Sequence, residues 1–352
     1  FGAFVRLSDA GLSCPDWPTC YGRASWPQNA SDVIDHAASA IRPLETHKAW
    51  REQLHRMLAG TLGVLVLTLA LLAARRRSRG VWHVLLAALA VAIAIPLYIQ
   101  GQHATAGAFA ALGEAVLLAA AWRWSNDDLA RVAVLALAVI VLQALLGMWT
   151  VTWLLKPIVV MGHLLGGMLT FALLAWMAWR ATGVPIRLAG ASGLRLALIV
   201  GVTLLGVQIA LGGWVSSNYA ALACGNDFPT CVGQWMPPHD FREGFVLWRG
   251  IGVDYEGGVL DGASRIAIQL AHRAMAALVF MYLLALTIKL VRTPGMRGWA
   301  LVLGAATLAQ VALGIANVKW SLPLAVAVAH NAGALLLLFV LVTLLARLRA
   351  PD

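Results

Sequence analysis

Four histidines are the residues of this chain whose type and spacing best suggest chemistry: His55, His163, His272 and His330. Each lies in a long apolar stretch, and the second two repeat the arrangement of the first two. Two imidazoles at one depth on facing helices of a bundle suit the two axial positions of a haem iron. The pattern therefore predicts haem sites between His55 and His163 and between His272 and His330. A simpler alternative is an interhelical hydrogen bond from each histidine, whereas zinc lacks a recurring third ligand.

The composition indicates which elements must position these histidines. Of the 352 residues, 61% are hydrophobic and 12% are charged, whereas a soluble domain carries about a quarter charged residues. Continuous apolar runs long enough to cross a bilayer favour membrane helices, because unpaired backbone amides are too costly in lipid. We expect spans at 48–74, 81–99, 104–124, 130–152, 158–180, 194–217, 266–291, 297–318 and 324–347, and the last turns of a truncated first helix at 1–7.

The net charge of +10 is better explained by membrane topology than by nucleic-acid binding. Short loops at 75–80, 180–195 and 292–297 are rich in arginine, which places them in the cytoplasm. The long polar segments 8–47 and 218–265 then lie outside, in the compartment where disulfides persist. Both segments carry cysteines spaced to close a small loop: Cys14–Cys20 and Cys224–Cys231. A structural disulfide is favoured for the second pair, whereas thiol exchange stays open for the first. The chain is expected to be a multi-pass protein of a bacterial inner membrane.

The chain contains an internal repeat. Residues 2–22 match 212–233, and both segments end in the pattern Pro-Thr-Cys-x-Gly. Six further identities follow at one constant offset: Gln143, Gly147, Val151, Trp153, His163 and Gly166 match Gln310, Gly314, Val318, Trp320, His330 and Gly333. The predicted fold is an all-α integral membrane protein of two pseudo-symmetric four-helix bundles. The first bundle spans 1–180 and includes an inserted helical hairpin at 81–124, and the second spans 194–352.

The two halves differ beside the histidines. Glu52 stands three residues before His55, one helical turn away, whereas Gln269 stands three residues before His272. A carboxylate can take up or hold protons and an amide cannot. The difference predicts proton-coupled chemistry in the first half and a permanent haem in the second. The alternative is that Glu52 lies among the lipid headgroups and forms a salt bridge with Arg51 or Arg56.

These motifs together resemble the haem A synthase family over nearly the whole chain. Gly11–Gly22 is similar to that family's first outer loop. Four further segments resemble its histidine sites: Glu52–Arg56, Met161–Gly167, Leu270–Arg273 and Val328–Gly333. The resemblance implies eight spans in two bundles, so the hairpin at 81–124 is an addition to the family pattern.

The resemblance also implies a function. Haem b would be the cofactor, held between His272 and His330, and the substrate haem O would bind between His55 and His163 with Glu52 as the catalytic carboxylate. The implied reaction oxidises the C8 methyl group of haem O by two hydroxylations, giving the formyl group of haem A for terminal oxidase assembly. Implied partners are membrane lipid, the protohaem farnesyltransferase that makes haem O and a quinone as candidate electron acceptor. A di-haem membrane electron carrier and a haem chaperone are the alternative functions.

Overall fold

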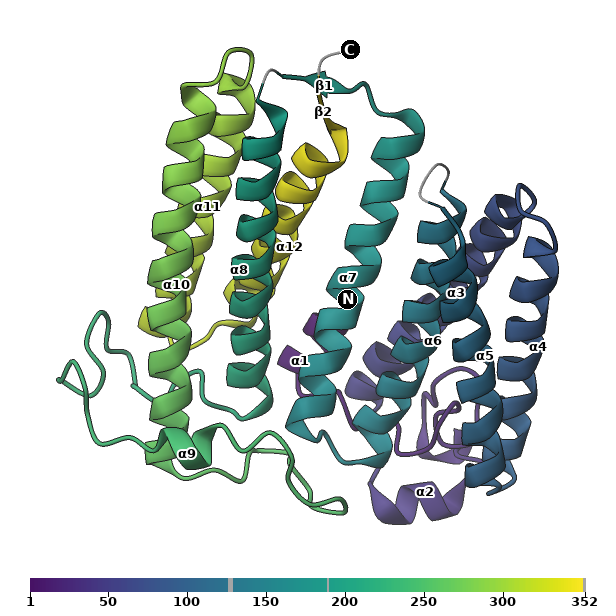
Figure 1. The fold of residues 1–352 in the computed structure, drawn as a ribbon. Helices are drawn as coiled ribbons and strands as arrows, with labels where there is room; N and C mark the ends of the chain where they lie inside the picture. Colours follow the sequence, from purple (N-terminus) through teal and green to yellow (C-terminus); the bar gives the residue numbers. More distant parts are fainter. Residues whose placement is uncertain (126–128, 189, 351–352) are drawn as a thin grey trace. The chain divides into compact units, whose positions relative to one another are not determined.

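The computed structural model describes residues 1–125, 129–188 and 190–350, and its regular structure is mostly α-helical (Figure 1). Nine helices in this described part are long and apolar enough to span a membrane. They are α3 (Thr46–Ala74), α4 (Gly80–Ile99), α5 (His103–Arg123), α6 (Ala130–Thr152), α7 (Pro157–Thr182), α8 (Ala191–Ser217), α10 (Gly262–Val291), α11 (Arg297–Lys319) and α12 (Leu324–Arg347). The predicted all-α membrane class and its nine spans are confirmed by these helices.

The boundaries differ from the predicted ones by a few residues, where local capping extends a helix beyond its apolar run. The clearest case is α10, which begins at Gly262 rather than at 266. Asp261 accepts a hydrogen bond from the backbone N–H of Ser264 at 2.8 Å, so its carboxylate satisfies an amide that the helix leaves unpaired. At α7, Pro157 occupies the first helical position, where a missing N–H has no consequence.

Short elements connect the long helices. They are α1 (Gly2–Leu7), a 3₁₀ turn η1 (Ala30–Asp32), α2 (His36–Ile41), β1 (Ile186–Arg187), α9 (Phe241–Gly244) and β2 (Leu348–Arg349). The α1 helix confirms that the residues expected to be helical at 1–7 form helix. Strands β1 and β2 pair in parallel over two residues each, an addition that the apolar pattern did not predict.

Contacts within the chain define two compact units. The first contains Phe1–His55, Met148–Leu165 and Pro185–Asp352, and the second contains Arg56–Gly147 and Gly166–Val184. Their boundaries fall inside α3, α6 and α7. This division follows spatial contacts, whereas the ranges 1–180 and 194–352 follow the sequence repeat, and those two domains stay a prediction.

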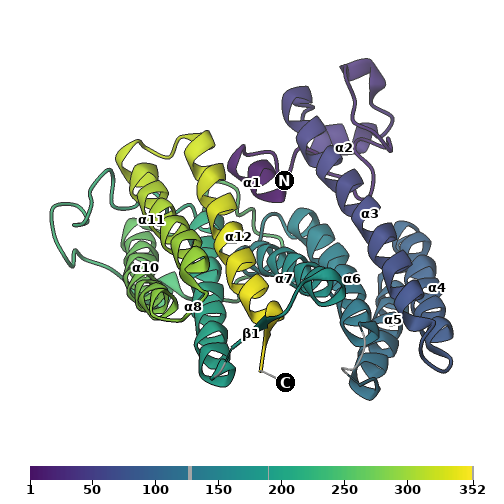
Figure 2. The ribbon, with the colours of Figure 1, turned by 90° about the horizontal axis from the view of Figure 1, so that it is seen from above.

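In the first unit, α8, α10, α11 and α12 form a closed ring of packed neighbours (Figure 2). Helix α10 packs against α8 and α11, and α12 also packs against α8 and α11. The helices that carry His272 and His330 therefore lie in one four-helix group, each touching the same two neighbours. The predicted pseudo-symmetry between two such bundles remains a prediction.

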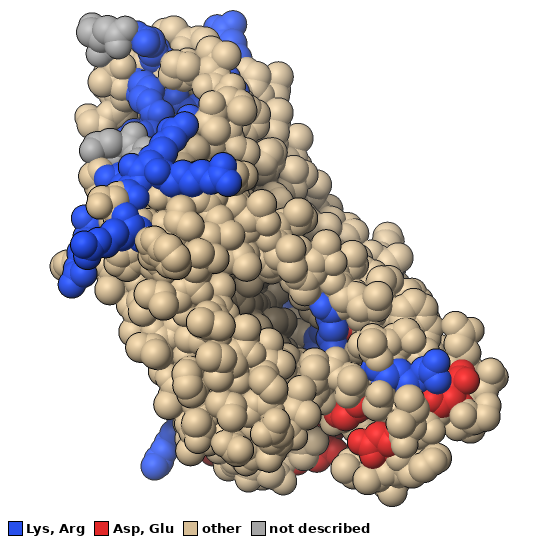
Figure 3. Space-filling view, turned by 90° about the vertical axis from the view of Figure 1, so that its right-hand side faces the viewer, with Lys and Arg blue, Asp and Glu red and all other residues tan. Residues whose placement is uncertain are grey.

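The second unit is built around the inserted hairpin. Helices α4 and α5 pack closely, and a Cβ built on Gly113 would lie only 3.0 Å from the carbonyl oxygen of Ala87. The buried core is dominated by small side chains, which let membrane helices approach one another. At one end of this unit, Figure 3 shows lysine and arginine side chains gathered together. Arg75, Arg76, Arg77 and Arg79 of the α3–α4 connection belong to this end.

Candidate functional site

The first predicted histidine pair comes together in the first unit. The ring centroids of His55 on α3 and His163 on α7 are 6.2 Å apart, and their planes meet at 76°. An iron bonded to one nitrogen of each ring at about 2 Å would hold the two ring centres about 6 Å apart. The observed separation is compatible with two ligands of one iron, and the haem site between His55 and His163 stays a prediction.

Glycines leave space at the edges of the imidazole rings. A Cβ built on Gly2 would lie 3.0 Å from Cε1 and Nε2 of His55, and one built on Gly212 would lie 3.3 Å from Cε1 of His272. Gly2 and Gly212 are equivalent in the repeat, so both halves place a glycine against the ring of the corresponding histidine. A larger side chain at either position would press against the imidazole ring, so glycine lets the backbone and the ring approach closely.

The second histidine pair is held by two glutamines. Gln208 on α8 places its amide nitrogen 3.2 Å from Nδ1 of His272. Gln310 on α11 donates from Nε2 to the backbone carbonyl of His330 at 3.0 Å. Nδ1 of His330 is buried and has no hydrogen-bond partner. A Cβ on Gly314 would lie 3.1 Å from Cε1 of His330.

A buried imidazole nitrogen without a partner is unusual unless something else binds the ring. Gly212 lies against the ring of His272, and Gly314 lies against the ring of His330. Together with the unpartnered Nδ1 of His330, these close approaches are compatible with a haem-binding site. Among the described residues, no group of three or more His, Cys, Asp or Glu side chains could hold a metal ion.

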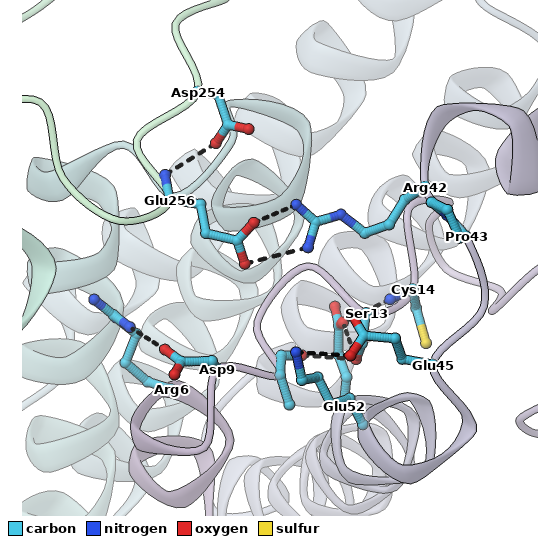
Figure 4. Close-up of polar contacts among 12 residues, drawn as sticks. Arg6, Asp9, Ser13, Cys14, Arg42, Pro43, Glu45, Glu52, Asp254 and Glu256 are labelled. Atoms are coloured by element: carbon cyan, nitrogen blue, oxygen red, sulfur yellow. Dashed lines mark hydrogen bonds and ion pairs between the residues drawn. The ribbon is translucent and has the colours of Figure 1, made fainter.

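Glu52 is buried and anchors the first outer loop. Its side chain lies on α3 one turn before His55, with only 4% of the residue exposed. The backbone N–H of Cys14 donates to Oε2 of Glu52 at 2.8 Å, and the Ser13 hydroxyl donates to the same oxygen at 3.0 Å (Figure 4). The carboxylate is thus enclosed rather than exposed among headgroups.

The equivalent position in the second half has a weaker anchor. Gln269 is 5% exposed and donates from Nε2 to the carbonyl oxygen of Ala221 at 3.2 Å. Its Oε1 is buried without a hydrogen-bond partner. Sequence reasoning identified the Glu52–Gln269 difference but missed the loop contacts. A signal was present, because the repeat aligns Ser13 with Ala223, which has no hydroxyl group.

The two cysteine loops have matching structures. Both predicted disulfides form, and the Cα atoms are 4.7 Å apart for Cys14–Cys20 and 4.6 Å apart for Cys224–Cys231. An aspartate side chain accepts a backbone hydrogen bond in each loop. Asp16 accepts one from the N–H of Gly22 at 2.9 Å, and Asp227 accepts one from the N–H of Gly233.

The backbone conformations of the loops agree as well. Tyr21 and Val232, one residue after the second cysteine of each loop, have φ of 52° and 50°. The glycines that follow them, Gly22 and Gly233, have φ of 79° and 74°, a region that favours glycine. The repeat seen in the sequence is therefore also a repeat in conformation.

The two outer segments are linked by contacts that the sequence analysis missed. Arg42 and Glu256 form a two-bonded ion pair, with Nη1 to Oε1 at 3.2 Å, and the pair is visible in Figure 4. This hydrogen-bonded pairing lowers the pKa of Glu256 and raises that of Arg42. Nearby, the backbone N–H of Tyr255 donates to the carbonyl of Leu154 at 3.1 Å. Residues this distant in sequence carry no spacing signal that could have predicted their pairing.

Comparisons with known proteins agree with these features. The profile of the cytochrome oxidase assembly protein family (COX15-CtaA) matches residues 1–102 and 102–342. A heme A synthase of Shewanella oneidensis is 38% identical over 347 residues, which cover 97% of this chain and 90% of the relative. A heme A synthase of Rhizorhabdus wittichii is 26% identical over 360 residues, covering 96% and 86%. One of Caulobacter vibrioides is 30% identical over 224 residues, covering 60% of each.

Proposed function

The chain belongs to the haem A synthase family, and from this we propose that it oxidises the C8 methyl group of haem O to the formyl group of haem A. Two successive hydroxylations would convert the methyl group to a geminal diol, and loss of one water leaves the aldehyde. We propose a membrane quinone as the electron acceptor, so each hydroxylation would take one oxygen atom from water and pass two electrons and two protons to the quinone. The product would serve the assembly of a terminal oxidase.

We assign the substrate to the first histidine pair, and the Glu52–Gln269 difference carries this assignment. His55 and His163 would hold the iron of haem O, and the buried Glu52 carboxylate would take up protons released as the methyl group is oxidised. The second pair has an amide at the corresponding position, which cannot exchange protons in this way. His272 and His330 would therefore hold haem b as a resident cofactor, which supplies one-electron transfer when bound.

The proposed location is the bacterial inner membrane, with the two cysteine-bearing segments outside the cytoplasm. The arginine cluster between α3 and α4 supports this orientation, because basic residues are retained on the cytoplasmic side. The two formed disulfides support it independently, since disulfides persist in oxidising compartments.

Haem analysis tests the proposed reaction. The chain is expressed in cells that also produce the farnesyltransferase for haem O, and the extracted haems are identified by mass. We expect haem A and its hydroxymethyl intermediate with the native chain. Glu52→Gln should abolish both products while haem remains bound. The matched control is Gln269→Ala at the repeat-equivalent position, which should retain product formation.

Two outcomes would contradict the proposal. Only unmodified haem in the native extract, with redox behaviour unchanged in Glu52→Gln, would favour an electron carrier. For the cofactor assignment, His272→Ala should remove the low-spin absorbance of the resident haem. Full absorbance in that variant would refute the assignment of haem b to the second pair.

A further inference from the structure

A buried lysine, Lys156, lies in the turn between α6 and α7, seven residues before His163. Lys156 is fully buried, and its ammonium nitrogen has no hydrogen-bond partner. The ammonium lies 3.3 Å from the ring centroid of Trp248 and 5.3 Å from that of Trp153. Cation–π contacts offset only part of the cost of removing an ammonium from water. Among the residues that the structure describes, this buried ammonium therefore has no carboxylate partner.

The repeat shows that the turn itself does not require a lysine. The equivalent turn joins α11 to α12, and the two have the same backbone conformation. Leu154 and Leu155 have φ of 49° and 59°, and the corresponding Ser321 and Leu322 have 58° and 60°. The position that follows is Lys156 in the first half and Pro323 in the second.

The hydrogen bonds of the two turns agree as well. The N–H of Leu155 donates to the carbonyl of Thr150 at 2.8 Å, and that of Leu322 donates to the carbonyl of Asn317 at the same distance. A proline completes this turn as well as a lysine does. The buried cation is therefore a feature that only the first half carries, as is the carboxylate of Glu52.

The position of Lys156 relates it to His163. Lys156 precedes the first residue of α7, and its carbonyl accepts from the N–H groups of Val159 and Val160. His163 follows seven residues later, which places the two side chains on one face of the helix, about 10 Å apart along its axis. That separation is comparable to the reach of a propionate from the iron of a haem. The amino end of a helix also favours a negative charge.

The aromatic ring nearest the ammonium belongs to an exposed residue. Trp248 lies over it and is itself 62% exposed, in a segment without regular structure between α9 and α10. Displacing this exposed indole would open Lys156 to a ligand without disturbing a membrane helix. Burial without an anionic partner lowers the pKa of the Lys156 ammonium, and a bound carboxylate would reverse that effect.

We propose that Lys156 binds a propionate carboxylate of the porphyrin that His55 and His163 hold, and so fixes the orientation of that porphyrin. This inference rests on the proposed function, because it takes haem O as the ligand of the first site. An ammonium–carboxylate pair in a buried site is a strong, directional contact. It distinguishes the propionate edge of the macrocycle from its other edges, and so determines which methyl group lies near Glu52.

Equilibrium binding tests the inference without turnover. The purified chain, with its second haem in place, is titrated with haem O and with the dimethyl ester of haem O, and binding is followed by absorbance. Haem O should bind the native chain at least tenfold more tightly than the ester does. Lys156→Met should remove this preference by weakening the binding of haem O alone. Lys156→Arg should retain most of it, because the positive charge is kept.

The control is Lys319→Met, which removes an exposed lysine beside the equivalent turn of the second half and should leave both affinities unchanged. Retention of the resident haem absorbance shows that each variant is folded. Equal affinity of the native chain for haem O and its ester would overturn the inference. So would an undiminished preference in Lys156→Met. Failure of the proposed function looks different: haem O would bind with the Lys156-dependent preference, yet no haem A would form.

Discussion

Replacing Glu52 with alanine should loosen the first cysteine loop as well as remove the carboxylate. Oε2 of Glu52 accepts hydrogen bonds from the N–H of Cys14 at 2.8 Å and from the hydroxyl of Ser13 at 3.0 Å. Hydrogen bonds to a charged group contribute about 1.5–3 kcal/mol each, and alanine would leave the buried N–H unpaired. We expect opening of the loop to become easier by about 3 kcal/mol.

This energy corresponds to about a hundredfold change in the opening equilibrium. Cys14 and Cys20 are fully buried, so a reductant reaches their disulfide only when the loop opens. The detergent-solubilised chain is treated with dithiothreitol, and the new thiols are alkylated and located by mass. Reduction of Cys14–Cys20 should be about a hundredfold faster in Glu52→Ala than in the native chain.

Glu52→Gln separates the two roles of this residue. The glutamine oxygen can still accept both hydrogen bonds, so reduction should accelerate by less than about tenfold, although the carboxylate is gone. The Cys224–Cys231 disulfide is the internal control, because Gln269 and not Glu52 stands beside its loop and donates to the carbonyl of Ala221. Unchanged reduction of Cys14–Cys20 in Glu52→Ala would refute the anchoring argument. Equal acceleration of both disulfides would indicate a general loss of structure instead of a local one.

Three further outcomes follow from the contacts described above. The pairing with Arg42 lowers the pKa of Glu256 from 4.5. The ion pair therefore contributes fully to the free energy of unfolding above pH 4.5, and this contribution is lost as the pH falls through the lowered pKa. Thermal unfolding across this range should show that loss, and Arg42→Met should flatten it. In Gly314→Val, the new side chain would press against His330, because a Cβ alone would lie 3.1 Å from Cε1 of that ring. The absorbance of the resident haem should therefore fall, and an unchanged spectrum would contradict the close approach. Asp16→Ala removes the acceptor of the backbone N–H groups of two loop residues, and reduction of the first disulfide should accelerate about tenfold or more.

The membrane helices were predictable from the sequence because each is defined by its own composition. A run of apolar residues must satisfy its backbone hydrogen bonds internally, whatever lies beside it. The two cysteine loops were predictable from local spacing as well, because cysteines six or seven positions apart can form a disulfide that closes a small loop. The proximity of His55 and His163 required more, and the internal repeat supplied it by placing both histidines at equivalent positions of two halves.

Contacts between distant segments could not be predicted in this way. The pairing of Arg42 with Glu256 joins two outer segments that are more than 200 residues apart, and nothing in the spacing of either residue marks it. The burial of Lys156 is a similar case. In sequence it resembles any lysine at a helix end, and only the placement of Trp248 above it shows an ammonium enclosed without a counter-ion.

The sequence by itself determined the helical class of the protein, its long apolar helices and the repeat, and it predicted the approach of His55 to His163. These properties depend on composition and periodicity, which act within one segment or between equivalent segments. The tertiary structure decided how the first half differs from the second. Folding brings Ser13 and Cys14 onto Glu52 and encloses Lys156 under Trp248, because buried charges take their partners from whichever segments the chain packs against them.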